Sequence, residues 1–365
     1  MFQNFYEGKK IFITGHTGFK GSWLCAWLLR LGAKLCGYSN GVPTTPSNFN
    51  ILGIEKKIHN VQGDICDYSS LLKAIQEFNP EIVIHLAAQS LVGKSYQQPV
   101  ETITTNALGT LNLLDCMRQA PGIRAGVFIT GDKCYKNVEW IWGYRENDAL
   151  GGDDPYSSSK GCAELIIHSY IKSYFNKAKS PAIASARAGN AIGGGDWAEN
   201  RIIPDAVRAW SKGNTLIVRN LEAKRPWQHV LEPLSGYLWL GKKLFEKDNN
   251  VVGQAFNFGP DAKIDRTVFD LLSEMQKNWP EAKWEEEPNI GKIKKEATLL
   301  KLNCDKALTS LGWRAILSFE ETVKMTAIWY KTYYDGHDGE MAKMVDSQIR
   351  AYENKALREG LLWAH

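Results

Sequence analysis

The chain has 365 residues, a formal net charge of +4 and 44% hydrophobic residues, enough to bury a large core in one α/β domain or two unequal ones. Lysine and arginine are spread along the chain and no run approaches the roughly 20 apolar residues of a membrane span, so neither nucleic acid nor a membrane is a predicted partner. Seven cysteines are scattered without a Cys-x-x-Cys pair. They favour reduced thiols and predict no metal site. The first ten residues lack the apolar core of a signal peptide, so we expect a cytoplasmic location.

The first predicted element is a buried strand over 10–14, which runs into a glycine-rich turn and then a helical pattern over 23–31. Glycines allow a tight turn, and the free N–H groups at a helix N-terminus attract phosphates. A Gly-x-x-Gly-x-x-Gly segment can be a plain loop, but its place between the first strand and the first helix indicates a dinucleotide site. The cofactor contacts predicted from this turn are Gly15, Thr17, Gly18, Phe19, Lys20 and Gly21.

The second strand, predicted over 34–38, ends in Ser39 and Asn40. An acidic residue there would bind the ribose 2′-hydroxyl of NAD and an arginine the 2′-phosphate of NADP. Neither is present, and the lack of a cation favours NAD. After the third strand, Asp64 either accepts a hydrogen bond from an adenine amino group or caps the helix that begins near Tyr68. The contacts predicted from these two strand ends are Ser39, Asp64 and Ile65.

The fourth strand is predicted over 81–89, and small residues at its carboxyl end would let a ribose approach the backbone. A long helix is predicted over 99–118. Asn106 lies in its middle, where asparagine is an indifferent helix former. It either supports the active site, where we count it among the cofactor contacts, or is satisfied in the core. The contacts predicted from the strand end are Leu86, Ala87, Ala88 and Gln89.

The fifth strand, predicted over 126–130, delivers Asp132 and Lys133 to the carboxyl edge of the sheet, where open α/β sheets bind ligands. Thr130, at its end, is a further predicted cofactor contact. The alternation of strands and helices predicts a doubly wound, Rossmann-type parallel sheet over 1–188. A smaller α/β part over 189–365 should bind the substrate, with a possible return of a strand or helix to the first domain.

Tyr156 and Lys160 begin the next helical segment and point from the same helix face. A phenol has a free pKa of about 10. A nearby ammonium group and an oxidised nicotinamide would favour the phenolate. The pair is suited to taking a proton from a sugar hydroxyl while hydride leaves for the cofactor. A Tyr-x-x-x-Lys pair also occurs on ordinary exposed helices, but the Rossmann context favours catalysis and cofactor contact.

Five longer stretches resemble the extended short-chain dehydrogenase/reductase family, most closely its nucleotide-sugar branch and, within it, the CDP-glucose 4,6-dehydratases. The resemblance runs nearly from end to end. Enzymes acting on dTDP-glucose carry Asp-Glu where this sequence has Asp132-Lys133, and the Asp-Lys pair is similar to the CDP-glucose enzymes. The stretches are 15–24 (GHTGFKGSWL), 132–135 (DKCY), 142–147 (WGYREN), 194–205 (GGDWAENRIIPD) and 225–231 (RPWQHVL).

The resemblance implies that the second half binds a nucleotide sugar. Asn190 would bond the sugar diphosphate, as its family counterpart does. Arg201 begins a helical run, so its charge and the helix dipole could both face a phosphate. Each arginine alone could be in a surface salt bridge of little value, but as a set they favour a ligand, because guanidinium geometry suits phosphate. The predicted substrate contacts are Asn190, Trp197, Arg201, Arg219 and Arg225.

One position departs from the family pattern. The active-site serine or threonine of the family falls on Gly131, which has no side chain to bond the sugar C4 oxygen. Thr130 precedes it but should face the opposite side of the strand. Loss of one neutral hydrogen bond typically costs about 1 kcal/mol, which slows a reaction rather than abolishing it.

The resemblance implies a redox-neutral dehydration of CDP-glucose with NAD. Tyr156, activated by Lys160, takes the C4 hydroxyl proton as hydride leaves. Asp132 then protonates the departing C6 hydroxyl, and Lys133 serves as the C5 base or holds an enolate. The competing hypotheses are another nucleotide-sugar dehydratase, a 4-epimerase, or a catalytically silent NAD(H) sensor or scaffold. A homodimer or homotetramer is expected from the resemblance alone.

Overall fold

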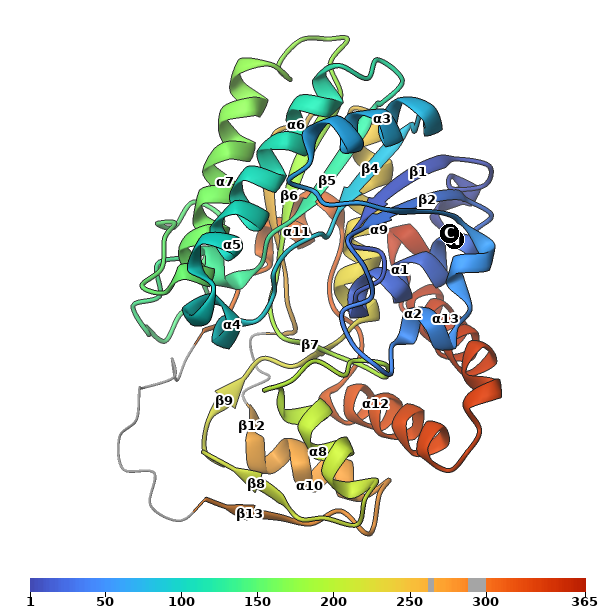
Figure 1. Cartoon of the computed structure of the whole chain (residues 1–365), viewed down its shortest axis with the longest axis vertical. Helices are drawn as coiled ribbons and strands as arrows, with labels where there is room; N and C mark the ends of the chain where they lie inside the picture. Colours follow the sequence, from blue (N-terminus) through green and yellow to red (C-terminus); the bar gives the residue numbers. More distant parts are fainter. Residues whose placement is uncertain (262–265, 288–299) are drawn as a thin grey trace.

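The computed structural model describes residues 1–261, 266–287 and 300–365. Its centre is a sheet of seven parallel strands in the order β11-β6-β5-β4-β1-β2-β3 (Figure 1). Parallel strands are covered on both faces, which is why they appear in the sequence as short apolar runs. The predicted α/β class with a parallel sheet is confirmed. The strands are β1 (Lys10–Thr14), β2 (Lys34–Ser39), β3 (His59–Gln62), β4 (Ile82–His85), β5 (Ala125–Ile129), β6 (Ala182–Ala188) and β11 (Ala255–Phe258).

Alternate side chains of β1 enter the two hydrophobic clusters on opposite faces of the sheet. Ile11 and Ile13 join one cluster and Phe12 joins the other, as the two-residue period of a strand requires. The Phe12 face is covered by α3 (Tyr68–Phe78), α6 (Gly109–Arg118) and α7 (Pro155–Ser173). The other face is covered by α1 (Phe19–Arg30) and α9 (Leu231–Phe245), with α13 (Met341–Arg358) packed on α1.

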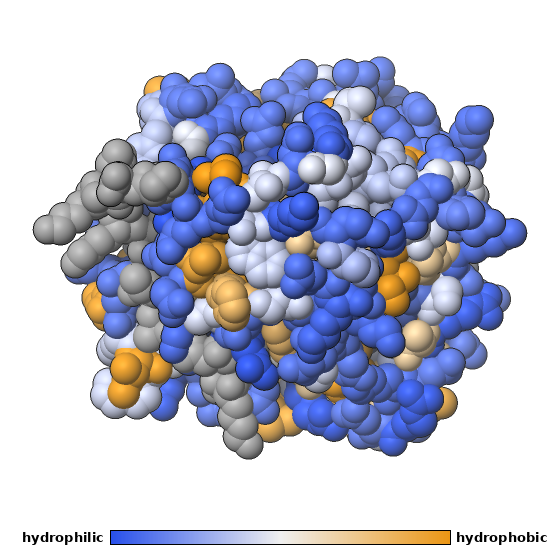
Figure 2. Space-filling model, turned by 90° about the horizontal axis from the view of Figure 1, so that it is seen from below, coloured by the Kyte–Doolittle hydropathy of each residue, from blue (hydrophilic) through white to orange (hydrophobic). Residues whose placement is uncertain are grey.

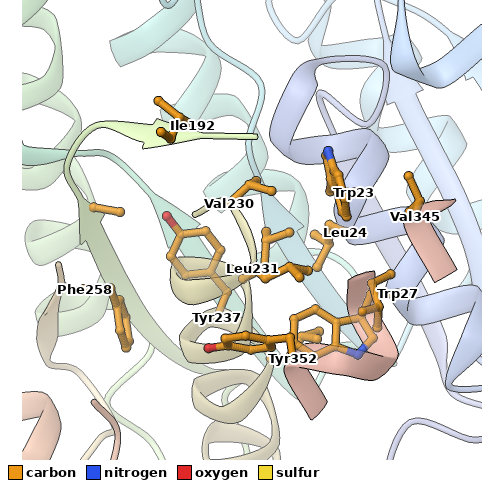
Figure 3. Packing of buried hydrophobic residues seen from close by; sticks show 14 of the residues in the cluster. Trp23, Leu24, Trp27, Ile192, Val230, Leu231, Tyr237, Phe258, Val345 and Tyr352 are labelled. Atoms are coloured by element: carbon orange, nitrogen blue, oxygen red, sulfur yellow. The ribbon is translucent and has the colours of Figure 1, made fainter. Parts of the chain in front are cut away.

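Large aromatic side chains fill the core on the α1 side. Trp23 and Trp27 of α1, Tyr237 of α9 and Tyr352 of α13 lie in one cluster (Figure 3). The Trp27 and Tyr352 rings meet edge to face at 5.8 Å, and Trp27 Nε1 donates to Glu353 Oε1 at 2.9 Å. The C-terminal helix is therefore part of the core that supports the start of the chain.

A smaller part lies below the carboxyl edge of the sheet (Figure 1). In it β8 pairs with β13 and β9 with β12, and β7 (Ala191–Ile192) pairs with β10 (Gln228–His229). The predicted division at residue 188 falls at the end of β6, and α9 and β11 then return to the sheet. The other elements here are α8 (Ile202–Trp210), β8 (Leu216–Val218), β9 (Lys224–Arg225), β12 (Arg266–Thr267), α10 (Val268–Gln276), β13 (Trp284–Glu286) and α12 (Phe319–Tyr334).

The face of this smaller part is mainly hydrophilic, with a few small hydrophobic patches (Figure 2). Among the helices that the structure describes, none is both long and apolar enough to span a bilayer. The remaining short helices are α2 (Asn48–Ile51), α4 (Val92–Gln97), α5 (Pro99–Ile103) and α11 (Asp305–Leu311).

Candidate active site

The strand order reverses next to β1, because β2 and β3 lie on one side of it and β4 to β6 on the other. Ligands of open α/β sheets bind at the carboxyl ends of the strands beside such a reversal. The turn from β1 to α1 lies there. Gly15 has a φ of +72°, and a Cβ on it would lie 2.6 Å from the Ala87 nitrogen. A Cβ on Gly21 would overlap the Gly15 carbonyl, so both positions exclude other residues.

Helix α1 begins at Phe19 with Gly18 as its N-cap and no side-chain cap. Its first-turn N–H groups therefore remain available to an anion, and the dipole favours negative charge. Thr17 Oγ1 lies 2.8 Å from Ser39 Oγ and donates to the Gly41 carbonyl at 2.7 Å, which joins this turn to the end of β2. The turn fits a dinucleotide pyrophosphate.

The structure separates the two alternatives for Asp64. Helix α3 is capped by Asp67, whose carboxylate accepts from Ser70 N at 3.1 Å. Asp64 instead accepts from Cys66 N at 2.8 Å and is exposed, so the helix-cap alternative is wrong and the adenine contact stays a prediction. The Ile65 side chain is buried in the core, where it can contribute packing only.

The predicted helix over 99–118 is confirmed, and its middle is a turn of π-helix that the sequence did not indicate. Helices α5 and α6 are joined by a turn of π-helix over Thr104–Leu108 that contains the buried Asn106. Its amide accepts from Gln89 N at 2.8 Å and donates to Gln89 O at 3.0 Å and to Ser159 Oγ at 2.8 Å. Ser159 in turn donates to the Tyr156 carbonyl at 2.6 Å. Asn106 thus ties the end of β4 to the first turn of α7, as π-turns at functional sites often do.

Tyr156 and Lys160 lie on successive turns at the start of α7. Asp154 caps this helix by accepting from the Tyr156 and Ser157 nitrogens, each at 3.0 Å, with proline at the first helical position. Lys160 Nζ lies 5.9 Å from the centre of the Tyr156 ring. Burial raises the pKa of Tyr156. Burial, helped by the charge of Lys20, lowers the pKa of Lys160 to about 8.

Asp132 follows β5 on a short 3₁₀ turn and is 7% exposed. Burial raises the pKa of its carboxyl group despite three nearby cations, which favours the protonated form. Tyr156 is close enough for the charge of Asp132 to raise its pKa too. The cations are Lys133, Lys20 and Arg225.

The backbone conformation at position 131 favours glycine over the serine or threonine of the family pattern. Its φ is +133°, a conformation that residues with a Cβ rarely adopt. Space is not the limit, because the nearest atom to a Cβ, the Ala188 carbonyl oxygen, would lie 3.6 Å away. A serine here could not supply its hydroxyl without strain.

We therefore expect Gly131→Ser to lower the free energy of unfolding by roughly 1–3 kcal/mol without increasing turnover. Denaturant unfolding and initial rates measure the two effects. Gly339→Ser is the matched control, since Gly339 has open space and an ordinary φ. A faster and equally stable Gly131→Ser variant would show that the site accepts the hydroxyl after all.

Thr130 points away from the site, so its side chain is not the predicted cofactor contact. It donates to the buried Glu164, which also pairs with Arg187 at 2.7 Å and accepts from Ser185 Oγ at 2.9 Å. Arg187 Nη1 also donates to the Tyr135 hydroxyl at 2.8 Å. Our sequence interpretation missed this network, although an arginine inside the apolar strand of 182–188 was a signal that a buried partner must exist.

The structure places the predicted substrate-binding arginines in different surroundings. Arg201 precedes α8, pairs with Asp196 at 2.8 Å and lies close enough to Tyr156 to affect its pKa. Arg225 is an electrostatic neighbour of Asp132, whereas Arg219 is exposed and contacts Asn200 at 3.4 Å.

Trp197 and Asn190 are the other two predicted contacts. Trp197 is a correction: it is 3% exposed, and its ring packs in the aromatic core against Trp329 at 5.5 Å. Its Nε1 donates to the Tyr334 hydroxyl at 3.1 Å, which satisfies its polar atom without a ligand. Asn190 precedes β7, and its carbonyl accepts from Gln228 N at 3.1 Å. In the parts of the chain described, no group of three His, Cys, Asp or Glu side chains could hold a metal ion.

A Rossmann-type sheet with a Tyr-Lys pair and a carboxylic acid at one edge defines a class of enzymes. Comparison with known proteins shows to which family of that class the chain belongs. The profile of the family described as GDP-mannose 4,6 dehydratase matches residues 12–326. The chain belongs to this family of nucleotide-sugar dehydratases, and the predicted resemblance is confirmed.

Individual relatives refine the comparison. The chain is 46% identical over 345 residues to CDP-glucose 4,6-dehydratase of Salmonella typhimurium, covering 92% of this chain and 94% of the relative. It is 25% identical to dTDP-glucose 4,6-dehydratase of Neisseria gonorrhoeae over 350 residues, which cover 89% of this chain and 96% of the relative.

Among solved structures, the epimerase Mth375 of Methanothermobacter thermautotrophicus matches with a TM-score of 0.78 and 22% identity, covering 91% of this chain and 95% of that one. The dTDP-glucose 4,6-dehydratase of Bacillus anthracis in complex with NAD matches with a TM-score of 0.75 and 22% identity. The match covers 90% of this chain and 98% of that one. These two matches support the fold.

Proposed function

We propose that this protein is a CDP-glucose 4,6-dehydratase that converts CDP-D-glucose to CDP-4-keto-6-deoxy-D-glucose and water. The observation that carries the proposal is the 46% identity along nearly the whole length of both chains to an enzyme of that name. The Asp-Lys pair at 132–133 and the convergence of Asp132, Tyr156 and Lys160 agree with it.

NAD is the proposed cofactor, and a solved relative with this fold holds it. When bound, it would accept hydride from C4 of the sugar and return it to C6. The glycine turn and the uncapped start of α1 would hold its pyrophosphate. The predicted contacts at Ser39, Asp64 and the end of β4 remain proposals for its adenosine half.

The side chains of the chain itself supply the proton transfers. Tyr156 would take the C4 hydroxyl proton, with Lys160 stabilising the phenolate. The 4-ketone then acidifies the C5 proton, and elimination follows across C5 and C6. Asp132, whose burial favours its protonated form, would protonate the departing C6 hydroxyl. The diphosphate is proposed to be bound by Arg201, Arg225 and Asn190. The exposed Arg219 is proposed as an outer contact of the substrate.

The test uses purified protein with CDP-, dTDP-, GDP- and UDP-glucose in turn, scored by the alkali-developed absorbance of a 4-keto sugar. We expect signal with the cytidine sugar alone. Signal with another nucleotide would move the protein to a sister dehydratase. The lack of signal with every sugar, despite bound cofactor, would favour the epimerase or the silent sensor.

Assembly and location remain part of the proposal. We expect a homodimer or homotetramer in the cytoplasm. Apolar side chains are exposed on α5, on the π-helical turn that follows it and on α7, and these elements contact one another. Among them are Val100, Leu108 and Leu165, and they support self-association. Light scattering of the purified protein measures the oligomer directly.

A further inference from the structure

The turn that carries Asp132 is short and holds itself weakly. It is a single 3₁₀ turn over Asp132–Cys134, with Gly131 as its N-cap and no side-chain cap. Cys134 N donates to the Gly131 carbonyl at 3.3 Å. Tyr135 N donates to the Asp132 carbonyl, also at 3.3 Å. Both hydrogen bonds are longer than the usual range of roughly 2.7–3.2 Å, so neighbouring elements must fix the place of the Asp132 carboxyl group.

Two close backbone approaches place this turn against the rest of the site. A Cβ on Gly189, the residue after β6, would lie 3.4 Å from Asp132 Oδ2. A Cβ on Gly161, the residue after Lys160 on α7, would lie 3.6 Å from the Cys134 carbonyl oxygen. The carboxyl group of Asp132 therefore lies at the end of β6, and its turn packs directly on the helix that carries the Tyr-Lys pair.

Tyr135 connects this turn to a buried polar network. It is 1% exposed. Its hydroxyl accepts from Arg187 Nη1 at 2.8 Å and donates to Asn257 Oδ1 at 2.7 Å. Its ring stacks on Tyr144, with the ring centres 5.3 Å apart. The Tyr135 side chain is therefore held by three different segments of the chain, and its hydroxyl is satisfied both as donor and as acceptor.

Arg187 connects Tyr135 to the helix of the Tyr-Lys pair. Its Nε and Nη2 atoms donate to the two carboxylate oxygens of Glu164 at 2.9 and 2.7 Å. Glu164 lies one turn after Lys160 on α7. A bidentate pair of this kind fixes orientation as well as distance, and a fully satisfied buried network is rigid. Arg187 is thus a rigid bridge between α7 and the residue that follows the Asp132 turn.

The proposed dehydration uses groups from both of these elements. Tyr156 and Lys160 act from α7 at C4, and Asp132 acts from the turn at C6. Resting on the proposed function, we infer that Tyr135 is a positioning residue, because its buried hydroxyl holds the turn where Asp132 can protonate the departing C6 hydroxyl. Its burial keeps Tyr135 from touching the sugar itself, so it acts on the elimination through Asp132.

The link can be removed without removing its partners. In Tyr135→Phe the ring keeps its stacking on Tyr144, and Arg187 keeps both bonds to Glu164. Oxidation at C4 should therefore stay near the wild-type rate. Elimination should slow by roughly 10–10²-fold, the effect of a small misplacement of an acting group. Reduced nicotinamide should then build up during turnover, which its absorbance reports when holoenzyme is mixed with CDP-glucose.

A double-variant cycle tests whether the effect passes through Asp132. Asp132→Asn removes the acid, and in that background Tyr135→Phe should cost less than about twofold, because no acid is left to misplace. Single-turnover formation of the 4-keto-6-deoxy sugar gives the four rates. A merely structural role of Tyr135 would lower the rate by the same factor in both backgrounds.

The matched control is Tyr352→Phe on α13. Tyr352 is also 1% exposed, and its hydroxyl donates to the buried Glu232 carboxylate at 2.6 Å. This variant should lose stability to denaturant without any build-up of reduced nicotinamide. Asn257→Ala removes the acceptor of the Tyr135 hydroxyl and should give the same build-up as Tyr135→Phe. It keeps the inference testable if Tyr135→Phe does not fold.

Three results would overturn the inference. The first is elimination at the wild-type rate in folded Tyr135→Phe. The second is equal slowing with and without Asp132, which would leave Tyr135 a structural role only. The third is slower oxidation at C4, which would move its effect to Tyr156. Wild-type protein that forms no 4-keto sugar from CDP-glucose would instead contradict the proposed function, a result visible before any variant is made.

Discussion

Tyr156→Phe should lower the turnover of CDP-glucose by roughly 10²–10⁴-fold, the range that a positioned acid–base group contributes. The variant keeps the ring and its packing but loses the oxygen that takes the C4 hydroxyl proton. The Asp154 cap and the Asn106 tether act on the backbone and Ser159, so α7 should remain in place. Initial rates of 4-keto sugar formation measure the loss, and calorimetric titration with CDP-glucose should show nearly unchanged affinity.

The control is Tyr170→Phe on the same helix. Tyr170 lies nearly four turns after Tyr156 and packs against Tyr174 at 5.0 Å. It should retain activity. If Tyr156→Phe turned over within tenfold of wild type, the phenol could not be the base. Intact ligand binding with no turnover even in the wild-type protein would support the silent sensor.

Arg187→Met should lower the free energy of unfolding by about 3–5 kcal/mol, the usual cost of removing one partner of a buried ion pair. Arg187 and Glu164 are each 4% exposed by side chain and 2.7 Å apart. Without the guanidinium group, the Glu164 charge stays buried with hydroxyl donors only. Urea or guanidinium unfolding at neutral pH measures the effect. Arg350→Met, in a pair whose side chains are 60% and 41% exposed, should change the midpoint little.

The pH dependence of this effect has a definite sign. Burial alone would raise the pKa of Glu164, but the charge and hydrogen bonds of Arg187 outweigh it and lower the pKa. The stability from this group is therefore present above its unfolded pKa of about 4.3 and is lost as the pH falls through the folded value. In Arg187→Met burial dominates, so the difference between variant and wild type should shrink on acidification. A difference that grew below this pH would contradict the assignment.

Much of the architecture follows from local patterns. Short apolar runs identify the strands of the first half, since a parallel strand is buried on both faces. The glycine turn follows from its place after β1, and the spacing of Tyr156 and Lys160 puts both on one face of α7. Each of these inferences uses residues fewer than about a dozen positions apart. It can therefore be made without knowing the fold.

Local patterns did not identify contacts between residues that are distant in the chain. The helix over 99–118 was predicted, but not its π-helical turn at Asn106, whose amide bonds Gln89 and Ser159. Strand alternation predicted that Thr130 faces away from the site, but only the fold identifies Glu164 as its partner. The helix propensities of single residues and the spacing of apolar residues do not include contacts with distant parts of the chain.

The sequence by itself determined the α/β class, the parallel sheet, the dinucleotide turn, the Tyr-Lys pair and the resemblance to nucleotide-sugar dehydratases. Only the tertiary structure placed Trp197 in the aromatic core, revealed the backbone conformation of Gly131 and joined Arg187 to Glu164. The physical reason is the same in each case. Burial and the electric field at a side chain are sums over neighbours in space, and neighbours in space are set by how the strands and helices pack.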